Sequence, residues 1–211
     1  MSAAPGLILN DGLRGRMLAN LARFERRAHD DRSLTPAAVA LLLVANDAGE
    51  ACFVITRRAA RMKDHAGQWA LPGGRLDPGE DAVTAALRES HEEVGARCSE
   101  GDVLGLLDDY PTRSGFVISP FEVWGGRDVN LVANPAEVEM IHRVPLRELL
   151  REDLPLLDSI DESPHPVLRM PLGDDWFAAP SAAIAYQFRE VALLGRCTRV
   201  AHFEQPYFAW Q

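Results

Sequence analysis

Cysteine is scarce in this 211-residue sequence: Cys52, Cys98 and Cys197 are widely spaced and form no CxxC pair. The pattern excludes a CxxC zinc or redox motif and indicates inert thiols in a reducing compartment. Also missing is an apolar run of the ~20 residues that a membrane helix needs. Basic residues number 22 against 31 acidic ones, and the net charge of −9 disfavours broad nucleic-acid binding. We expect a cytoplasmic protein that binds neither membranes nor nucleic acid.

The residues that are present suit one globular domain of the mixed α/β class. Hydrophobic residues make up 47% of the chain and charged residues 25%, as in ordinary globular domains. Apolar residues at helical spacing predict an amphipathic helix over residues 12–27, with Pro36 marking its end. We expect residues 1–35 to form a helical extension packed on a domain that spans residues 36–211.

Short β-prone runs alternate with helical patterns in that domain. Dense alanine, leucine, arginine and glutamate predict a helix over 81–94, ending at Gly95, a residue that tolerates positive φ. A second packed helix is predicted at 181–194, and the segment 155–166, rich in acids and prolines, is predicted to be a loop. The other predicted elements are strands at 39–44, 52–55, 103–107, 116–123 and 138–144, turns at 46–49 and 125–126, and a short helix at 146–150.

Three carboxylates on helix 81–94 share one face. Glu89, Glu92 and Glu93 are spaced i, i+3 and i+4, within a single turn. In water their repulsion costs only ~0.2–0.5 kcal/mol per pair, so a solvated acidic face explains them cheaply. A hard divalent cation offers another explanation, because Mg²⁺ and Mn²⁺ accept carboxylate oxygens and would remove the repulsion. The spacing of these three residues leaves both explanations open.

The wider segment from Gly74 to Ala96 resembles the Nudix box, Gx5Ex7REUxEExGU, where U is aliphatic. Ser90 and Ala96 depart from it at two aliphatic packing positions. The resemblance implies an α/β Nudix fold, with a mixed β-sheet sandwiched between α-helices, and metal-dependent cleavage of a phosphoanhydride bond with Mg²⁺ or Mn²⁺. The seven fixed positions are all matched, by Gly74, Glu80, Arg88, Glu89, Glu92, Glu93 and Gly95.

The same resemblance assigns roles to these residues. Arg88 would orient a neighbouring carboxylate, which is compatible with a plain i, i+4 pair with Glu92. Glu137, in a segment like one of the family's, would be a general base, with Glu139 as the fallback and an exposed loop glutamate as the alternative. The implied metal ligands are Glu89, Glu92, Glu93, a supporting Glu80 and the backbone of Gly74.

A further stretch resembles the coenzyme A pyrophosphatase branch, LLTxRSxxxRxHxGxVxFPGGxxDxxD. It runs from Thr56 to Glu80, with Ala59, Lys63, Trp69 and Leu71 replacing the usual residues. Asp108 to Phe116 also looks like this branch. The residues expected to bind substrate are Arg57, Arg58, Lys63, His65 and Arg113.

Each member of this cationic set has a plainer explanation. The strip could be an exposed charged loop, and for His65 we favour a role in fixing the loop over catalysis. The branch implies hydrolysis of coenzyme A or acyl-coenzyme A to 3′,5′-ADP and 4′-phosphopantetheine. The alternatives are another nucleoside diphosphate derivative, such as ADP-ribose or NADH, and a non-catalytic nucleotide sensor. A monomer and a homodimer both stay open.

Overall fold

The computed structural model of the protein describes residues 7–61 and 67–210. An eight-stranded sheet is built around the order β3-β2-β1-β7-β5, with β4 beside β1, β6 beside β7 and β8 beside β2, and a three-stranded sheet has the order β11-β10-β9. The elements are α1 (Asp11–Leu21), β1 (Thr35–Ala45), β2 (Ala51–Arg58), β3 (Trp69–Ala70), β4 (Gly73–Arg75), α2 (Ala82–Val94), a 3₁₀ turn (Glu100–Asp102), β5 (Val103–Leu106), β6 (Tyr110–Pro111), β7 (Phe116–Gly126), β8 (Val138–Pro145), α3 (Leu146–Leu149), β9 (Leu156–Ile160), β10 (Ser163–Leu172), β11 (Asp175–Ala178), α4 (Ser181–Phe188), a π-helical turn (Arg189–Leu193) and a second 3₁₀ turn (Tyr207–Ala209).

The larger sheet is mixed. Strands β1 and β7 run parallel, with Thr35 opposite Phe116 at one end and Val44 opposite Gly126 at the other, whereas the remaining pairs are antiparallel. A parallel pair of this kind is usually covered on both faces, so its strands are mostly apolar. In β1 the buried residues alternate between the two cores, Leu41 facing one and Leu42 the other.

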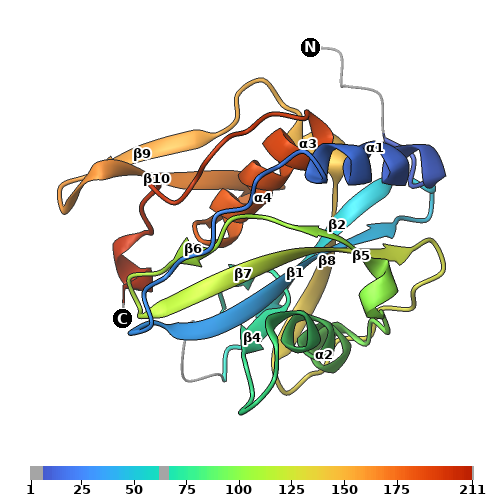
Figure 1. Cartoon of the computed structure of the whole chain (residues 1–211), viewed down its shortest axis with the longest axis horizontal. Helices are drawn as coiled ribbons and strands as arrows, with labels where there is room; N and C mark the ends of the chain where they lie inside the picture. The colour runs from blue at the N-terminus through green and yellow to red at the C-terminus, as the bar shows by residue number, and fades with distance from the viewer. Residues whose placement is uncertain (1–6, 62–66, 211) are drawn as a thin grey trace.

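Helices cover both faces of the larger sheet (Figure 1). Ala85, Ala86 and Val94 of α2 pack into one core, and α1 and α4 contribute Met17 and Phe188 to the other. Burial of a large apolar side chain contributes about 1.5–3 kcal/mol, so these faces hold the layers together. The expected mixed sheet between helices is confirmed. Among the described residues, no helix is both long and apolar enough to span a membrane.

The N-terminal helix is shorter than predicted. It ends at Leu21 rather than Arg27, and Pro36 lies inside β1 instead of ending a helix. The backbone N–H of Arg27 donates to Asp108 at 2.7 Å and that of His29 donates to Asp109 at 3.0 Å. These side-chain acceptors replace helical carbonyl acceptors, so the chain after α1 follows the sheet in an extended path.

The prediction of a loop at residues 155–166 is wrong. Strand β9 and the first four residues of β10 lie there. The pairing of β9 and β10 shifts register between Ser163 and Val167, and this irregularity accommodates Pro164 and Pro166, which cannot donate ladder hydrogen bonds. The predicted turn at 125–126 is also wrong, since both glycines end β7. The helix predicted at 181–194 is α-helical only to Phe188 and continues as the π-helical turn.

Candidate active site

Helix α2 is capped at both ends, by Asp81 and by Gly95. The Asp81 carboxylate accepts a 2.8 Å hydrogen bond from the Thr84 backbone N–H, satisfying a free donor of the first turn. At the other end Gly95 has φ of 73°, the left-handed conformation that glycine adopts without strain. The helix therefore carries its glutamates between fixed ends, after the loop that follows β4.

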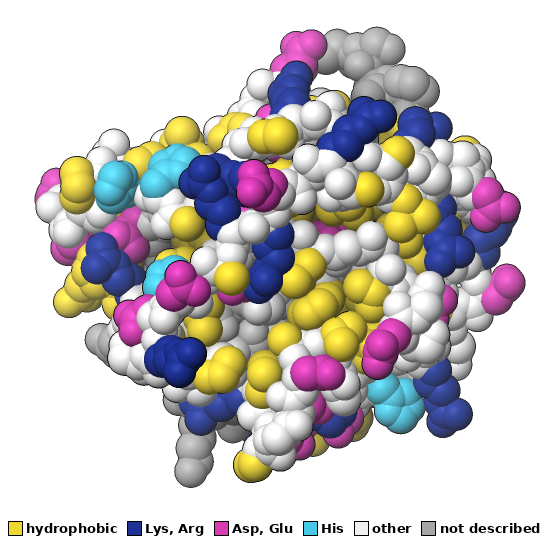
Figure 2. Space-filling view, in the orientation of Figure 1, with side chains coloured by type: hydrophobic (Ala, Val, Ile, Leu, Met, Phe, Trp, Pro, Cys, Tyr) yellow, Lys and Arg dark blue, Asp and Glu magenta, His cyan; other side chains and the backbone are white. Residues whose placement is uncertain are grey.

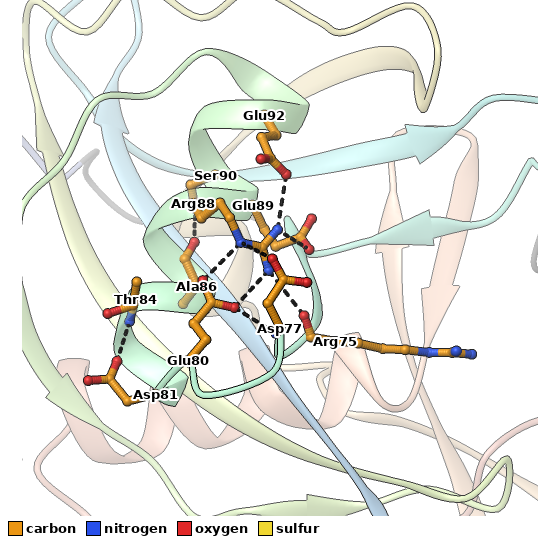
Figure 3. Close-up of polar contacts among 10 residues, drawn as sticks. All are labelled: Arg75, Asp77, Glu80, Asp81, Thr84, Ala86, Arg88, Glu89, Ser90 and Glu92. Carbon is orange, nitrogen blue, oxygen red and sulfur yellow. Dashed lines mark hydrogen bonds and ion pairs between the residues drawn. The ribbon is translucent and has the colours of Figure 1, made fainter.

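Arg88 lies at the centre of an ion-pair network (Figure 3). Its Nε and Nη2 donate to the two carboxylate oxygens of Glu80, at 2.9 and 3.0 Å. Its Nη1 donates to Glu89 at 2.9 Å and to Glu92 at 3.0 Å. Hydrogen bonding to Glu80 first, and then to Glu89 and Glu92, raises the pKa of the guanidinium. Arg88 is thus a fixed positive charge that orients three carboxylates, and the i, i+4 pair with Glu92 is part of the same network.

Glu80 faces Arg88 and not the other carboxylates of the predicted metal site. Its carboxylate also accepts the Asp77 backbone N–H at 2.9 Å, and the hydrogen bonds from Arg88 first, and then from Asp77, hold the Glu80 pKa below its usual value. Glu92 also turns toward Arg88, with 51% of its side chain exposed. The solvated-face explanation therefore suits Glu92, whereas Glu93 is only 4% exposed.

The carboxylates that converge are Glu89, Glu93 and Glu137, each offering an oxygen within 4.8 Å of the others. Glu137 comes from the turn before β8, and backbone hydrogen bonds fix that turn. The Asn134 N–H donates to the Glu93 carbonyl at 2.9 Å, and the Ala59 N–H donates to the Glu137 carbonyl at 2.8 Å. The turn is thereby held between the C-terminal end of α2 and the end of β2. Glu139 lies outside this cluster.

Burial and like charge disfavour the ionised forms of these groups. Burial first, and the nearby Glu89 next, raise the pKa of Glu93 to about 8, although Arg58 opposes the shift. Burial also raises the pKa of Glu89. Carboxylates that are buried together without enough positive charge fit a divalent cation, which would stabilise their ionised forms. The donor set consists of oxygens alone, as Mg²⁺ and Mn²⁺ prefer.

Gly73 and Gly74 allow β4 to approach both β1 and this cluster. A Cβ on Gly74 would lie 2.3 Å from Glu89 Oε1, so any side chain there would displace that carboxylate. A Cβ on Gly73 would lie 2.3 Å from the backbone oxygen of Ala38. The two glycines therefore exclude side chains for different reasons, one beside the carboxylates and the other inside the sheet.

A cavity of about 730 Å³ shares the β4 edge of the cluster, through Gly73 and Gly74. Arg57 and Arg58, at the end of β2, line it as well. Arg57 Nε donates to the Gly67 carbonyl at 3.3 Å and lies 3.9 Å from Glu139. The buried Nε of Arg58 has no hydrogen-bond partner among the described residues. Positive charge is therefore placed between the carboxylates and a ligand-sized space.

Not every predicted substrate-binding residue reaches the cavity. Arg113 is bound to Glu204, with Nη2 2.7 Å from Oε2, and its guanidinium lies 5.1 Å from the centre of the Trp210 ring. It is absent from the cavity lining, although its neighbours Thr112 and Ser114 belong to it. Lys63 and His65 lie outside the described residues.

The opposite wall of the cavity was not predicted from the sequence. It consists of β11, the start of α4 and the segment around Gln205. Arg75, which follows the two glycines, also lines the cavity and places its guanidinium 4.9 Å from the centre of the Phe116 ring. These residues fall at no recognisable spacing, and only the folded chain brings them together.

Residues 34–164 match the family model described as the NUDIX domain. The chain belongs to the Nudix family. This membership agrees with the capped helix, its glutamates and the mixed sheet, and it confirms the expected Nudix fold.

Acidic and basic side chains are interspersed over the face shown in Figure 2.

Similar proteins carry the same family name. The chain is 41% identical over 98 residues to the "Uncharacterized Nudix hydrolase NudL" of Photorhabdus laumondii, covering 46% of this chain and 52% of that protein. It is 30% identical over 135 residues to "Nudix hydrolase 3" of Caenorhabditis elegans, covering 62% of this chain and 56% of that protein. The chain thus spans about half the length of these curated relatives. The crystal structure of the Nudix hydrolase RenU from M. smegmatis is similar at 20% identity, with a TM-score of 0.49 over 78% of this chain and 89% of that one.

Proposed function

We propose that the protein is a Nudix hydrolase that cleaves the pyrophosphate of coenzyme A or acyl-coenzyme A, giving 3′,5′-ADP and (acyl-)4′-phosphopantetheine. The observation that carries this proposal is the placement of Arg57 and Arg58 in a cavity that borders the carboxylate cluster. A carboxylate cluster can hold the metal that a diphosphate needs, and neighbouring guanidinium groups can pair with further phosphates. Coenzyme A carries both a pyrophosphate and a 3′-phosphate.

The residues fit Mg²⁺ or Mn²⁺. Glu89, Glu93 and Glu137 would supply oxygens from the cluster, with the Gly74 carbonyl as a further ligand and Glu80 supporting them through Arg88. Glu92, which pairs with Arg88 in the structure, would join the ligands by turning from that ion pair toward the metal. When bound, such an ion would neutralise negative charge on the pyrophosphate as the phosphorus is attacked. Burial, and after it the nearby carboxylates, raise the pKa values of Glu89 and Glu93, and a bound divalent cation would favour their ionised forms.

The chain's own groups then orient the reaction. Arg88 holds Glu89 and Glu92, so that their carboxylates keep fixed positions. We assign the role of general base to Glu137, whose carboxylate oxygen not bound to the ion would accept a proton from the attacking water, and Glu139 is the fallback for that role. Arg57 and Arg58 bind the phosphates outside the cleaved bond, and Lys63 and His65 are proposed to join them. We also propose that residues 1–35 form an extension of a domain spanning 36–211.

One experiment separates this function from its rivals. The purified protein is incubated with Mg²⁺ or Mn²⁺ and either coenzyme A, acetyl-coenzyme A, dephospho-coenzyme A, ADP-ribose or NADH, and the products are identified by mass spectrometry. We expect cleavage of coenzyme A and acetyl-coenzyme A at the pyrophosphate, and a kcat/KM at least tenfold lower for dephospho-coenzyme A, which lacks the 3′-phosphate. Activity confined to ADP-ribose or NADH would overturn the coenzyme A assignment, and no cleavage of any compound would favour the sensor.

A further inference from the structure

The wall of the cavity that faces β3 and β4 comes from residues beyond 164, where the family match ends. Two hydrogen bonds fasten it to the larger sheet. The Trp69 indole Nε1 donates to Asp175 at 2.8 Å, and the Leu71 backbone N–H donates to the Ser181 hydroxyl at 3.3 Å. This wall therefore stands in a fixed position relative to the carboxylate cluster, and its side chains can select the part of a ligand that does not react.

Gln205 is a buried polar residue of this wall. The residue is 3% exposed and lines the cavity. Its backbone is satisfied, since its N–H donates to Glu204 at 3.0 Å and its carbonyl accepts the Trp210 indole N–H at 2.8 Å. Both hydrogen bonds described for Gln205 within residues 7–61 and 67–210 come from its backbone, which leaves the side-chain amide available to a ligand in the cavity that the residue lines. An amide offers both a donor and an acceptor, so a ligand in the cavity with a matching edge could pair with it.

Arg113 holds this segment in place. Its ion pair with Glu204 and its position over the Trp210 ring fix the residues on both sides of Gln205. Arg113 belongs to the turn between β6 and β7, and β7 begins at Phe116. Gln205 is thus tied to the turn that leads into Phe116, and both residues line the cavity.

Phe116 and Arg75 provide a planar surface in the cavity lining. The backbone carbonyl of Arg75 accepts a 3.1 Å hydrogen bond from Arg88, while its side chain extends away from Arg88 (Figure 3). The guanidinium lies over the Phe116 ring, with 4.9 Å from Cζ to the ring centre. Aromatic rings and guanidinium planes are the surfaces on which proteins stack nucleobases.

We propose that Gln205 is a specificity-determining residue that binds the adenine base of the substrate, with Arg113 as its positioning residue. A glutamine amide offers a donor beside an acceptor, and adenine offers its ring nitrogen beside its 6-amino group, so the two can form a pair of hydrogen bonds. This inference rests on the proposed function only in requiring an adenine nucleotide as the substrate.

The test compares two ligands that differ only in the 6-amino group of the purine. Dissociation constants are measured by titration calorimetry for adenosine 3′,5′-bisphosphate and for the analogue whose purine lacks the 6-amino group. We expect the unaltered protein to bind the adenine ligand about tenfold more tightly, and Gln205→Met, which keeps length but lacks the amide, to bind both equally. Thermal melting checks that the variant is folded.

Two further variants serve as a control for the substitution and as a test of the positioning residue. Gln68→Met makes the same chemical change elsewhere in the lining and should leave the ratio of the two constants unchanged. Arg113→Met should lower the ratio while leaving the purine analogue's constant within about twofold, which a general loss of folding would not do. A ratio that persists in Gln205→Met, or equal weakening of both ligands, would overturn the proposal. Because binding is measured without turnover, a failure to cleave coenzyme A would leave this test standing.

Discussion

Trp69 and Asp175 are 106 residues apart in the chain, yet the indole Nε1 of one donates to the carboxylate of the other at 2.8 Å. This bond joins β3 of the larger sheet to β11 of the smaller one. It connects the strand that precedes the two glycines in the chain to the wall that the family match does not include. The bond also helps to hold the pKa of Asp175 below its usual value.

We expect Asp175→Ala to loosen this wall of the cavity and to raise KM severalfold, with a smaller change in kcat, because the residue lines the cavity but is not part of the carboxylate cluster. A net hydrogen bond contributes about 0.5–1.5 kcal/mol, so Tm should fall by about 1–6 °C in a chain of this size. Steady-state kinetics and a thermal melt measure both. A fall in kcat at unchanged KM would contradict this role for the wall.

Gly73 and Gly74 make a matched pair of tests. Gly74→Ala should displace the flexible end of Glu89 and reduce metal affinity and turnover at least tenfold, while Tm changes little. Gly73→Ala meets backbone atoms of Ala38 and Val39, which cannot move without disturbing β1, and should lower Tm strongly. Melting curves and manganese titration distinguish the two variants. If the two variants lost stability equally, the Glu89 side chain would be unable to move aside for a Cβ at position 74, contrary to this prediction.

Glu93→Gln removes a charge from the buried cluster. We expect manganese affinity and turnover to fall by two orders of magnitude or more, since the amide supplies a weaker ligand. Without metal, the variant should be more stable than the unaltered protein above pH 8, because there the unaltered protein carries an ionised Glu93, the form that burial and Glu89 disfavour. Calorimetric metal titration and melting in the presence of a chelator measure these effects. Full metal affinity in the variant would remove Glu93 from the proposed ligands.

Glu122 offers a pH test outside the site. It is fully buried on β7, neither carboxylate oxygen has a partner among the described residues, and burial raises its pKa to about 8. The folded state therefore holds this proton more tightly than the unfolded chain, whose pKa is near 4.5. Stability from Glu122 is complete below about pH 4.5 and is lost as the pH rises through 8.

We expect Glu122→Gln, which stays neutral, to match the unaltered protein at pH 5 and to be more stable at pH 9, by at most a few kcal/mol. Denaturant unfolding across this range, with a chelator present, measures the difference. Glu93 titrates in the same window in both proteins, so its contribution cancels. Parallel stability curves for the two proteins would show that Glu122 is protonated or paired throughout.

The sequence by itself determined helix α2 and the direction of its glutamates. Asp81 and Gly95 are local capping signals, and residues three and four apart must share a face once the helix forms. The spacing of Glu80, Arg88 and Glu92 likewise decided that they belong to one motif. Such features depend on neighbouring residues, so sequence alone can specify them.

Tertiary structure decided which carboxylates converge and what faces them. Glu93 is buried because α2 packs on the sheet, and Glu137 joins it because backbone bonds from Asn134 and Ala59 hold a distant turn beside the helix. Glu92, from the same motif, instead points to solvent and Arg88. The wall carrying Gln205 forms through contacts between segments more than 90 residues apart, such as Arg113 with Glu204. No local pattern encodes such contacts, because their energy exists only once the layers have packed.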